Sequence, residues 1–163
     1  TKIIPRTGIV RNNVHLSFYS RSTDTGGNQV DFGSFDGASI AQLSADYNYS
    51  GGGSCARFHS VGGSGEIVAL KASQPNSMGF YNSSRLSDTD FKFYKNGVLI
   101  GSNLANHIGL APNAALVLSA LTNIQYSNKE CAFASVGDGL TDTEAANFYT
   151  AVQALQTSLS RQI

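Results

Sequence analysis

The sequence predicts an all-β fold in which two antiparallel sheets pack as a jelly-roll sandwich, closed by one amphipathic helix at the C-terminus. Short segments with an apolar residue at every second position recur along the chain, and breaks rich in Gly, Asn and Ser separate them. Only one segment has helical periodicity, so an alternating α/β arrangement is disfavoured. A length of 163 residues fits a single domain over 1–163. Because the chain begins at Thr1, we expect it to be the C-terminal part of a larger protein.

Strand patterns fill the first half of the chain. The segment 14–20 alternates Val14, Leu16 and Phe18 with other residues, which is the period-two pattern of a half-buried strand. Glycine-rich stretches at 51–54 and 62–65 resemble hairpin loops, since strand patterns continue on both sides of each. We expect further strands within 28–35, 38–50, 55–61 and 67–70.

The second half contains the clearest local signal. Asn96-Gly97 stands between the alternating segments "FKFYK" and "VLIGS", and Asn-Gly supplies the positive φ angles of a two-residue type I′ turn. A β-hairpin is therefore predicted there, after a strand around 78–81. The apolar run 114–121 and the alternating segment 130–137 predict central, well-covered strands.

The C-terminal segment 141–161 predicts the helix. Thr141 and Glu144 have the spacing of a capping box, in which each side chain binds a free backbone N–H of the first turn. The apolar stripe that should face the sheets consists of Ala145, Phe148, Val152, Leu155 and Leu159. This face carries no acid, His or Cys, so we expect a structural role.

Composition limits the classes of partner. Charged residues make up 13% of the chain, against about 25% in an average domain. The formal net charge is zero and Lys and Arg are scattered, which argues against nucleic acid as a partner. No apolar run approaches the length of a membrane span, so membrane insertion is not expected. Cys55 and Cys131 are predicted to be two buried thiols, with a disulfide as the alternative.

Residues with catalytic chemistry are sparse. Asp88 and Asp90 are the one same-face acid pair, and their surroundings indicate a turn. The chain has three histidines but no G-x-S-x-G elbow and no phosphate-binding loop. We therefore expect no enzyme and no cofactor. Calcium ligation by Asp88 and Asp90, or by Asp36 and Asp46, stays open as an alternative.

Aromatic residues next to amides and hydroxyls suggest a sugar site. Sugars are bound by ring stacking together with hydrogen bonds from neutral polar groups. Three segments combine such residues: "DYNYS", "RFHS" and "FYNSSR". The candidate glycan-binding residues are Tyr47, Tyr49, Arg57, His59, Tyr81 and Asn82.

Two further stretches carry a resemblance to a known family. The hairpin "FKFYKNGVLIGS" is similar to one in laminin-G-like jelly rolls of the concanavalin A-like lectin/glucanase superfamily. The opening "VHLSFYSRS" and the ending "CAFASVGDGLTDTEAANFYTAVQALQTSLSRQI" resemble a module at the C-termini of tail or fibre proteins of bacterial viruses and of host proteins. The acidic E-x-D-x-x-E string of the glucanases is absent.

This resemblance implies a non-catalytic, lectin-like module that contacts host-surface glycan or another receptor. Its place would be a virion tail or another extracellular surface. The alternatives are a structural domain of a fibre, with a homotrimer formed through the parent protein, and an accessory carbohydrate-binding module of a secreted bacterial enzyme. A glycoside hydrolase that uses Asp88 and Asp90 is the least favoured reading.

Overall fold

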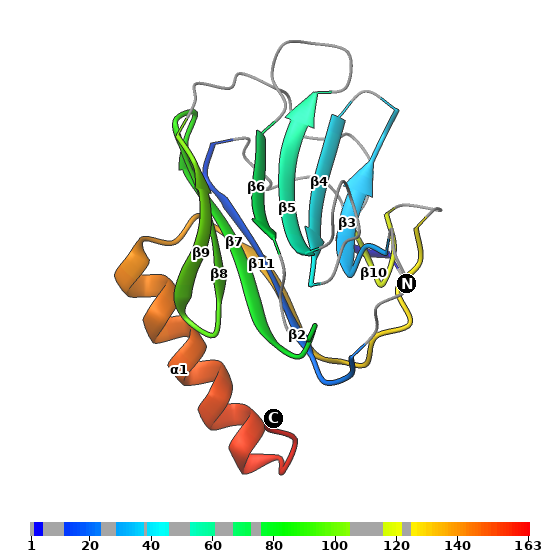
Figure 1. Cartoon of the computed structure of the whole chain (residues 1–163), viewed down its shortest axis with the longest axis vertical. Coiled ribbons are helices and arrows are strands. Elements are labelled where there is room, and N and C mark those ends of the chain that lie inside the picture. Colours follow the sequence, from blue (N-terminus) through cyan, green and yellow to red (C-terminus); the bar gives the residue numbers. More distant parts are fainter. Residues whose placement is uncertain are drawn as a thin grey trace.

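The computed structural model describes residues 2–4, 12–23, 29–37, 39–45, 53–60, 67–72, 76–104, 116–121 and 125–163. These residues form two antiparallel sheets and one helix, which confirms the predicted sandwich with its C-terminal helix (Figure 1). The helix, α1, lies against the outer face of one sheet. No helix in this part of the chain has the length and apolar character needed to cross a bilayer.

The first sheet has six strands in the order β1-β10-β3-β4-β5-β6, and the second has five in the order β11-β2-β7-β8-β9. Neighbouring strands in both sheets run antiparallel. The elements are β1 (Lys2–Ile4), β2 (Val14–Ser20), β3 (Phe32–Phe35), β4 (Ser39–Ser44), β5 (Gly53–Ser60), β6 (Ile67–Ala72), β7 (Gly79–Ser87), β8 (Asp90–Lys95), β9 (Val98–Asn103), β10 (Leu116–Leu118), β11 (Cys131–Gly137) and α1 (Asp142–Ser158).

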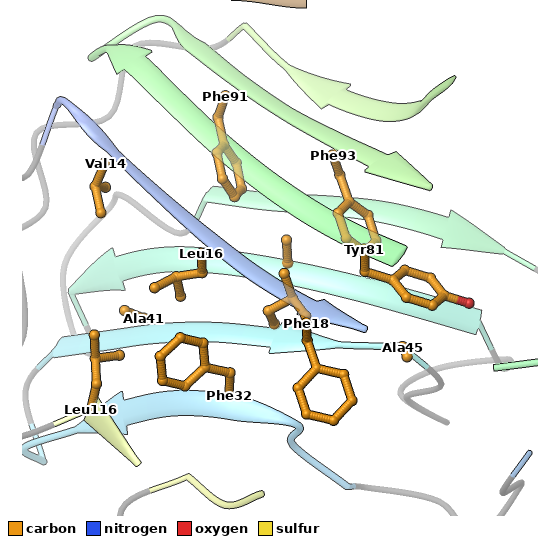
Figure 2. Packing of buried hydrophobic residues seen from close by; sticks show 12 residues of the cluster. Val14, Leu16, Phe18, Phe32, Ala41, Ala45, Tyr81, Phe91, Phe93 and Leu116 are labelled. Atoms are coloured by element: carbon orange, nitrogen blue, oxygen red, sulfur yellow. The ribbon is translucent and has the colours of Figure 1, made fainter. Parts of the chain in front are cut away.

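The main core lies between the two sheets. Alternate residues of β2 point inward and meet apolar side chains of β3 and β4, as Figure 2 shows for Leu16, Phe18 and Phe32. Phe91 and Phe93 of β8 close the same core from the five-stranded sheet. Period-two alternation on strands from both sheets thus fills one apolar layer.

Strand β2 is buried on both faces, which differs from the half-buried strand that its sequence pattern predicts. All seven of its residues are buried. One face joins the main core, while Tyr19 on the other face joins Phe80 and Val152 of α1 in a second apolar cluster. The helix therefore makes β2 a central strand of a three-layer region.

The hairpin between β8 and β9 forms at the predicted turn. Asn96 and Gly97 have φ angles of 50° and 74°, the left-handed values of a type I′ turn. The Asn96 side chain also accepts a hydrogen bond from the Phe80 backbone N–H, at 2.8 Å. Gly97 lies against Tyr149 of α1, so the turn packs on the helix.

Helix α1 begins at the predicted capping box. The Thr141 hydroxyl accepts a bond from the Glu144 backbone N–H, and the Glu144 carboxylate accepts one from the Thr141 backbone N–H. The helix ends at Ser158, three residues before the predicted end at 161.

The predicted apolar stripe of α1 is correct in its first half and wrong in its second. Ala145 and Val152 are buried, whereas Leu155 and Leu159 are 43% and 48% exposed. Gln156 is buried in their place, and its amide donates to the Ala132 carbonyl at 3.5 Å. Leu155 and Leu159 point away from the sheet because the buried side of the helix continues through Val152 and Gln156.

Three strand predictions need correction. In the described part of the run 114–121 only Leu116–Leu118 form a strand, β10, which is central between β1 and β3 but half-buried at two of its three residues. β11 is an edge strand whose residues are half-buried, so it is not a well-covered central strand. β7 is longer than predicted and continues to Ser87. An apolar run shows that a segment can be buried, but its length in a sheet depends on how much partner strand lies beside it.

Gly97→Ala should destabilise the protein more than Gly37→Ala. Both glycines have positive φ, 74° and 88°, which costs an L-residue about 1 kcal/mol. A β-carbon at Gly97 would also lie 3.1 Å from Tyr149 Cδ1, whereas within the described part of the chain nothing lies within 4 Å of one at Gly37. Urea unfolding of both variants measures the difference. Equal losses would show that the hairpin does not press on the helix.

Candidate functional site

The structure describes four of the six predicted glycan-binding residues and places them as two pairs on different sheets. Tyr47 and Tyr49 lie outside the described residues. Arg57 and His59 lie on β5, where they pair with Gln42 and Ile40 of β4. Two residues apart on one strand, they share a face of the six-stranded sheet, the sheet that α1 does not cover (Figure 1).

Tyr81 and Asn82 are enclosed by the protein, with exposed fractions of 0% and 1%. Tyr81 points into the main core, where its ring stacks on Phe93 with centroids 6.0 Å apart. Asn82, the next residue on β7, faces the opposite way, toward α1. Neither side chain offers a surface to an external sugar.

A polar row crosses the five-stranded sheet on the face toward α1. The strand register places its four residues side by side: Ser135 of β11, Ser17 of β2, Asn82 of β7 and Tyr94 of β8. Ser17 Oγ and Ser135 Oγ are 2.7 Å apart and hydrogen-bonded. This row is the largest set of polar side chains that the described sheets bring together under the helix.

His15 joins one end of this polar row. Its Nε2 lies 3.0 Å from Ser135 Oγ, and its Nδ1 lies 2.7 Å from the Asp138 carbonyl oxygen. Because a carbonyl only accepts, Nδ1 carries the proton and Nε2 accepts from Ser135. Burial lowers the pKa of His15 below 6.5, and the bond to Asp138 only partly offsets that effect.

The His15–Ser135 pair has the atoms of a nucleophile and its base, but it is closed to a substrate. His15 is 8% exposed, and the Phe148 ring packs edge-on against it with centroids 5.5 Å apart. An orienting carboxylate is replaced by the Asp138 carbonyl. The pair therefore positions chain segments beneath the helix.

The segment 137–141 leads into α1 directly over this site. A β-carbon at Gly137 would lie 2.8 Å from His15 Cε1, and one at Gly139 would collide with the Arg85 carbonyl oxygen. The Gly139 N–H donates to Asn13 Oδ1 at 2.8 Å. Only residues without a side chain allow so close an approach, which explains the glycines of "VGDGL".

Lys92 and Tyr94 anchor the start of α1. The Asp142 carboxylate accepts bonds from Tyr94 Oη and Lys92 Nζ, both at 2.7 Å. These bonds, Lys92 first, lower the pKa of Asp142, while burial and the bond to Asp142 raise that of Tyr94. An acid at the helix N-terminus also complements the helix dipole.

A buried ion pair joins the residue before β3 to the segment before β11. Lys129 Nζ is 3.4 Å from Asp31 Oδ1, and both side chains are fully buried. Asp31 also accepts bonds from the Ser127 hydroxyl and the Ala45 N–H, each at 2.6 Å. Burial raises the pKa of Asp31 and the Lys129 charge opposes this rise. The pair connects the segment before β11 to the start of β3.

The other residues with catalytic side chains, Asp88, Asp90 and Cys131, are held in ion pairs or are protonated. Asp88 pairs with the buried Arg85 at 3.3 Å in the tight turn between β7 and β8, and Asp90 pairs with Lys92 at 3.8 Å. Among the described residues Cys131 is a free thiol, and burial raises its pKa to about 11, so it is protonated at neutral pH. The described part of the chain contains no cluster of three or more potential metal ligands.

Sequence reasoning missed the polar layer under the helix. His15 and Ser135 are 120 residues apart, and no local motif links them. The one available signal is that His15 and Ser17 occupy the polar positions of an alternating strand, which sequence alone reads as solvent-facing. Once a helix covers that face, the same positions become buried hydrogen-bonding groups.

The buried His15 should make folding sensitive to mild acid. The unfolded chain binds a proton near pH 6.5 and the folded chain binds it only at lower pH. The contribution of His15 to the free energy of unfolding should therefore be constant above pH 6.5 and fall as the pH drops below that value. Urea unfolding between pH 7.5 and about 5 measures this slope, and His15→Asn should flatten it relative to the wild type. An unchanged slope in that variant would assign the acid sensitivity to other groups.

Comparison with solved structures finds domain 4 of AbnA, a GH43 extracellular arabinanase from Geobacillus stearothermophilus, in complex with arabinotriose. The two chains are 14% identical with a TM-score of 0.47, and the alignment covers 84% of this chain. This chain spans 65% of the length of that structure. No family model and no curated protein matches the chain.

Proposed function

We propose that the chain is a non-catalytic, lectin-like recognition module that binds glycan through its six-stranded sheet. The observation that carries the proposal is the strand register, which gives Arg57 and His59 one face of β5 in the sheet that α1 leaves uncovered. Arg and His supply hydrogen-bond donors suited to sugar hydroxyls. Tyr47 and Tyr49, in the connection from β4 to β5, are proposed to add the stacking surface.

The neighbouring strand limits where the glycan can lie. Ile40 and Gln42, the partners of these two residues on β4, are buried. Val30 and Leu121 cluster with Ile40 on that face. We therefore place the ligand toward β6 and the β4–β5 connection.

The described chemistry supports a binding role over a catalytic one. His15 and Ser135 are enclosed beneath α1, Cys131 is protonated, and Asp88 and Asp90 are held in ion pairs. The resemblance of the two chain ends to modules of viral tail and fibre proteins suggests a host-surface glycan as the ligand. In this proposal the module acts on a virion tail or another extracellular surface, or as an accessory module of a secreted enzyme.

A glycan array followed by calorimetry tests the proposal. Arg57→Ala and His59→Ala should each weaken binding of an array hit by about 10-fold, the loss expected when one hydrogen bond to the ligand is removed. Arg21→Ala is the matched control, because Arg21 forms an ion pair with Glu130 at the ends of β2 and β11, in the other sheet. Its affinity should be unchanged.

Two outcomes would contradict the proposal. One is the absence of binding to any glycan on the array. The other is a hit whose affinity is the same in wild type, Arg57→Ala and His59→Ala, which would move the site away from β5.

A second candidate function is assembly through protein contacts, favoured by exposed apolar side chains at a sheet edge. On the edge strand β9, Val98 and Leu99 are 65% and 46% exposed, and Leu104 just beyond it is 64% exposed. Exposed apolar edge strands are sites of strand pairing between chains. In this reading a second and third copy of the chain cover this edge, as in a fibre trimer.

Sedimentation equilibrium tests the assembly. If β9 is the interface, Leu99→Lys should shift wild-type oligomers to monomers, because it places a charge in an apolar contact. Leu159→Lys is the control, since Leu159 is similarly exposed, at 48%, but lies at the end of α1. A wild type that stays monomeric at high micromolar concentration would exclude this function for the isolated chain.

A further inference from the structure

Asn82 is a buried amide that lacks hydrogen bonds. It is 1% exposed, and neither its Oδ1 nor its Nδ2 has a partner among the residues that the structure describes. A buried amide of this kind costs free energy unless some group satisfies it, and the usual group is an ordered water molecule. Asn82 therefore points to a bound species beneath α1.

The strand register defines the floor and walls around this amide. Asn82 lies in the polar row between Ser17 and Tyr94. Along β7 its neighbours on the same face are Phe80 and Ser84. The Phe80 ring packs on Phe148 with centroids 5.4 Å apart, and Ser84 Oγ donates to the Leu140 carbonyl at 2.7 Å.

Helix α1 forms the roof. The segment that leads into α1 contacts β7 at Leu140, and α1 itself contacts β7 at Phe148; Ala145 lies between these two positions in sequence. Ala145 is 1% exposed, so it faces the sheet. Its methyl group is the smallest of the three buried side chains on α1, which are those of Ala145, Val152 and Gln156.

The two neighbours of Asn82 in the row, Ser17 and Tyr94, both donate their hydroxyl hydrogens to other groups. The Asp138 carbonyl fixes the His15 proton on Nδ1, so Ser135 donates to His15 Nε2 and Ser17 donates to Ser135. Ser17 Oγ then retains acceptor capacity on the side of Asn82. At the other end of the row, Tyr94 Oη uses its hydrogen on Asp142 and likewise can only accept.

We propose that the buried amide of Asn82, on the face of β7 toward α1, marks an enclosed hydration site that holds at least one long-lived water molecule. Such a water accepts from Asn82 Nδ2 and donates to Ser17 Oγ. A water that donates to Asn82 Oδ1 satisfies the other end of the amide. Water fits because it is the smallest neutral molecule that both donates and accepts, and because the site has several polar partners. The helix thus docks on the sheet through a layer that includes bound water.

Oxygen-17 magnetic relaxation dispersion on the whole chain tests the proposal, because it counts water molecules held inside a protein for longer than nanoseconds. The wild type should hold at least one more such water than Asn82→Leu. Asn147→Leu is the control, because Asn147 is an exposed Asn on α1. The number of long-lived waters in this variant should equal that of the wild type.

A second measurement decides the matter if Asn82→Leu does not fold. In the wild type, the Asn82 side-chain amide protons should show a cross-peak to water in a rotating-frame Overhauser spectrum, with the sign of dipolar contact. Absence of that cross-peak would overturn the proposal. So would an equal water count in wild type and Asn82→Leu, which would identify Asn82 as a dry, unpaired amide.

Discussion

The docking of α1 on the five-stranded sheet is the interaction on which the other features of this structure depend. Segment 137–141 is held by His15, Asn13 and Ser84, and glycines at 137 and 139 let it approach the backbone beneath. Asp142 then fixes the first turn to Tyr94. Docking buries the outer face of β2. Burial of Val152 of α1 against this face alone contributes about 1.5–3 kcal/mol to stability.

Because α1 occupies one outer face, the two sheets have different roles. The central strands of the five-stranded sheet, β2 and most of β7, are buried on both faces, and polar residues of this sheet bond to the segment that leads into the helix. The six-stranded sheet carries Arg57 and His59 on β5, and α1 does not cover it. This asymmetry is the structural reason to look for recognition on β5 and its connections.

Most of the architecture could be predicted from local patterns, while the contents of the site could not. Alternation identified β2, and Asn96-Gly97 and Thr141–Glu144 fixed a turn and a cap, since each depends on residues close in sequence. The burial of Leu155 was mispredicted because the side of a helix that meets a sheet is a tertiary property. Tyr81 and Asn82 were predicted at a sugar site from their residue types, but their burial depends on the second sheet and on α1.

Amide hydrogen exchange tests most directly whether α1 is an integral layer of the fold. If docking holds the five-stranded sheet together, the amides of α1 from Ala145 to Gln156 should exchange with the same opening free energy as those of β2 and β7, because all three open in one cooperative step. Exchange of the helix amides at rates near those of an unfolded peptide, with β2 and β7 still protected, would contradict the account.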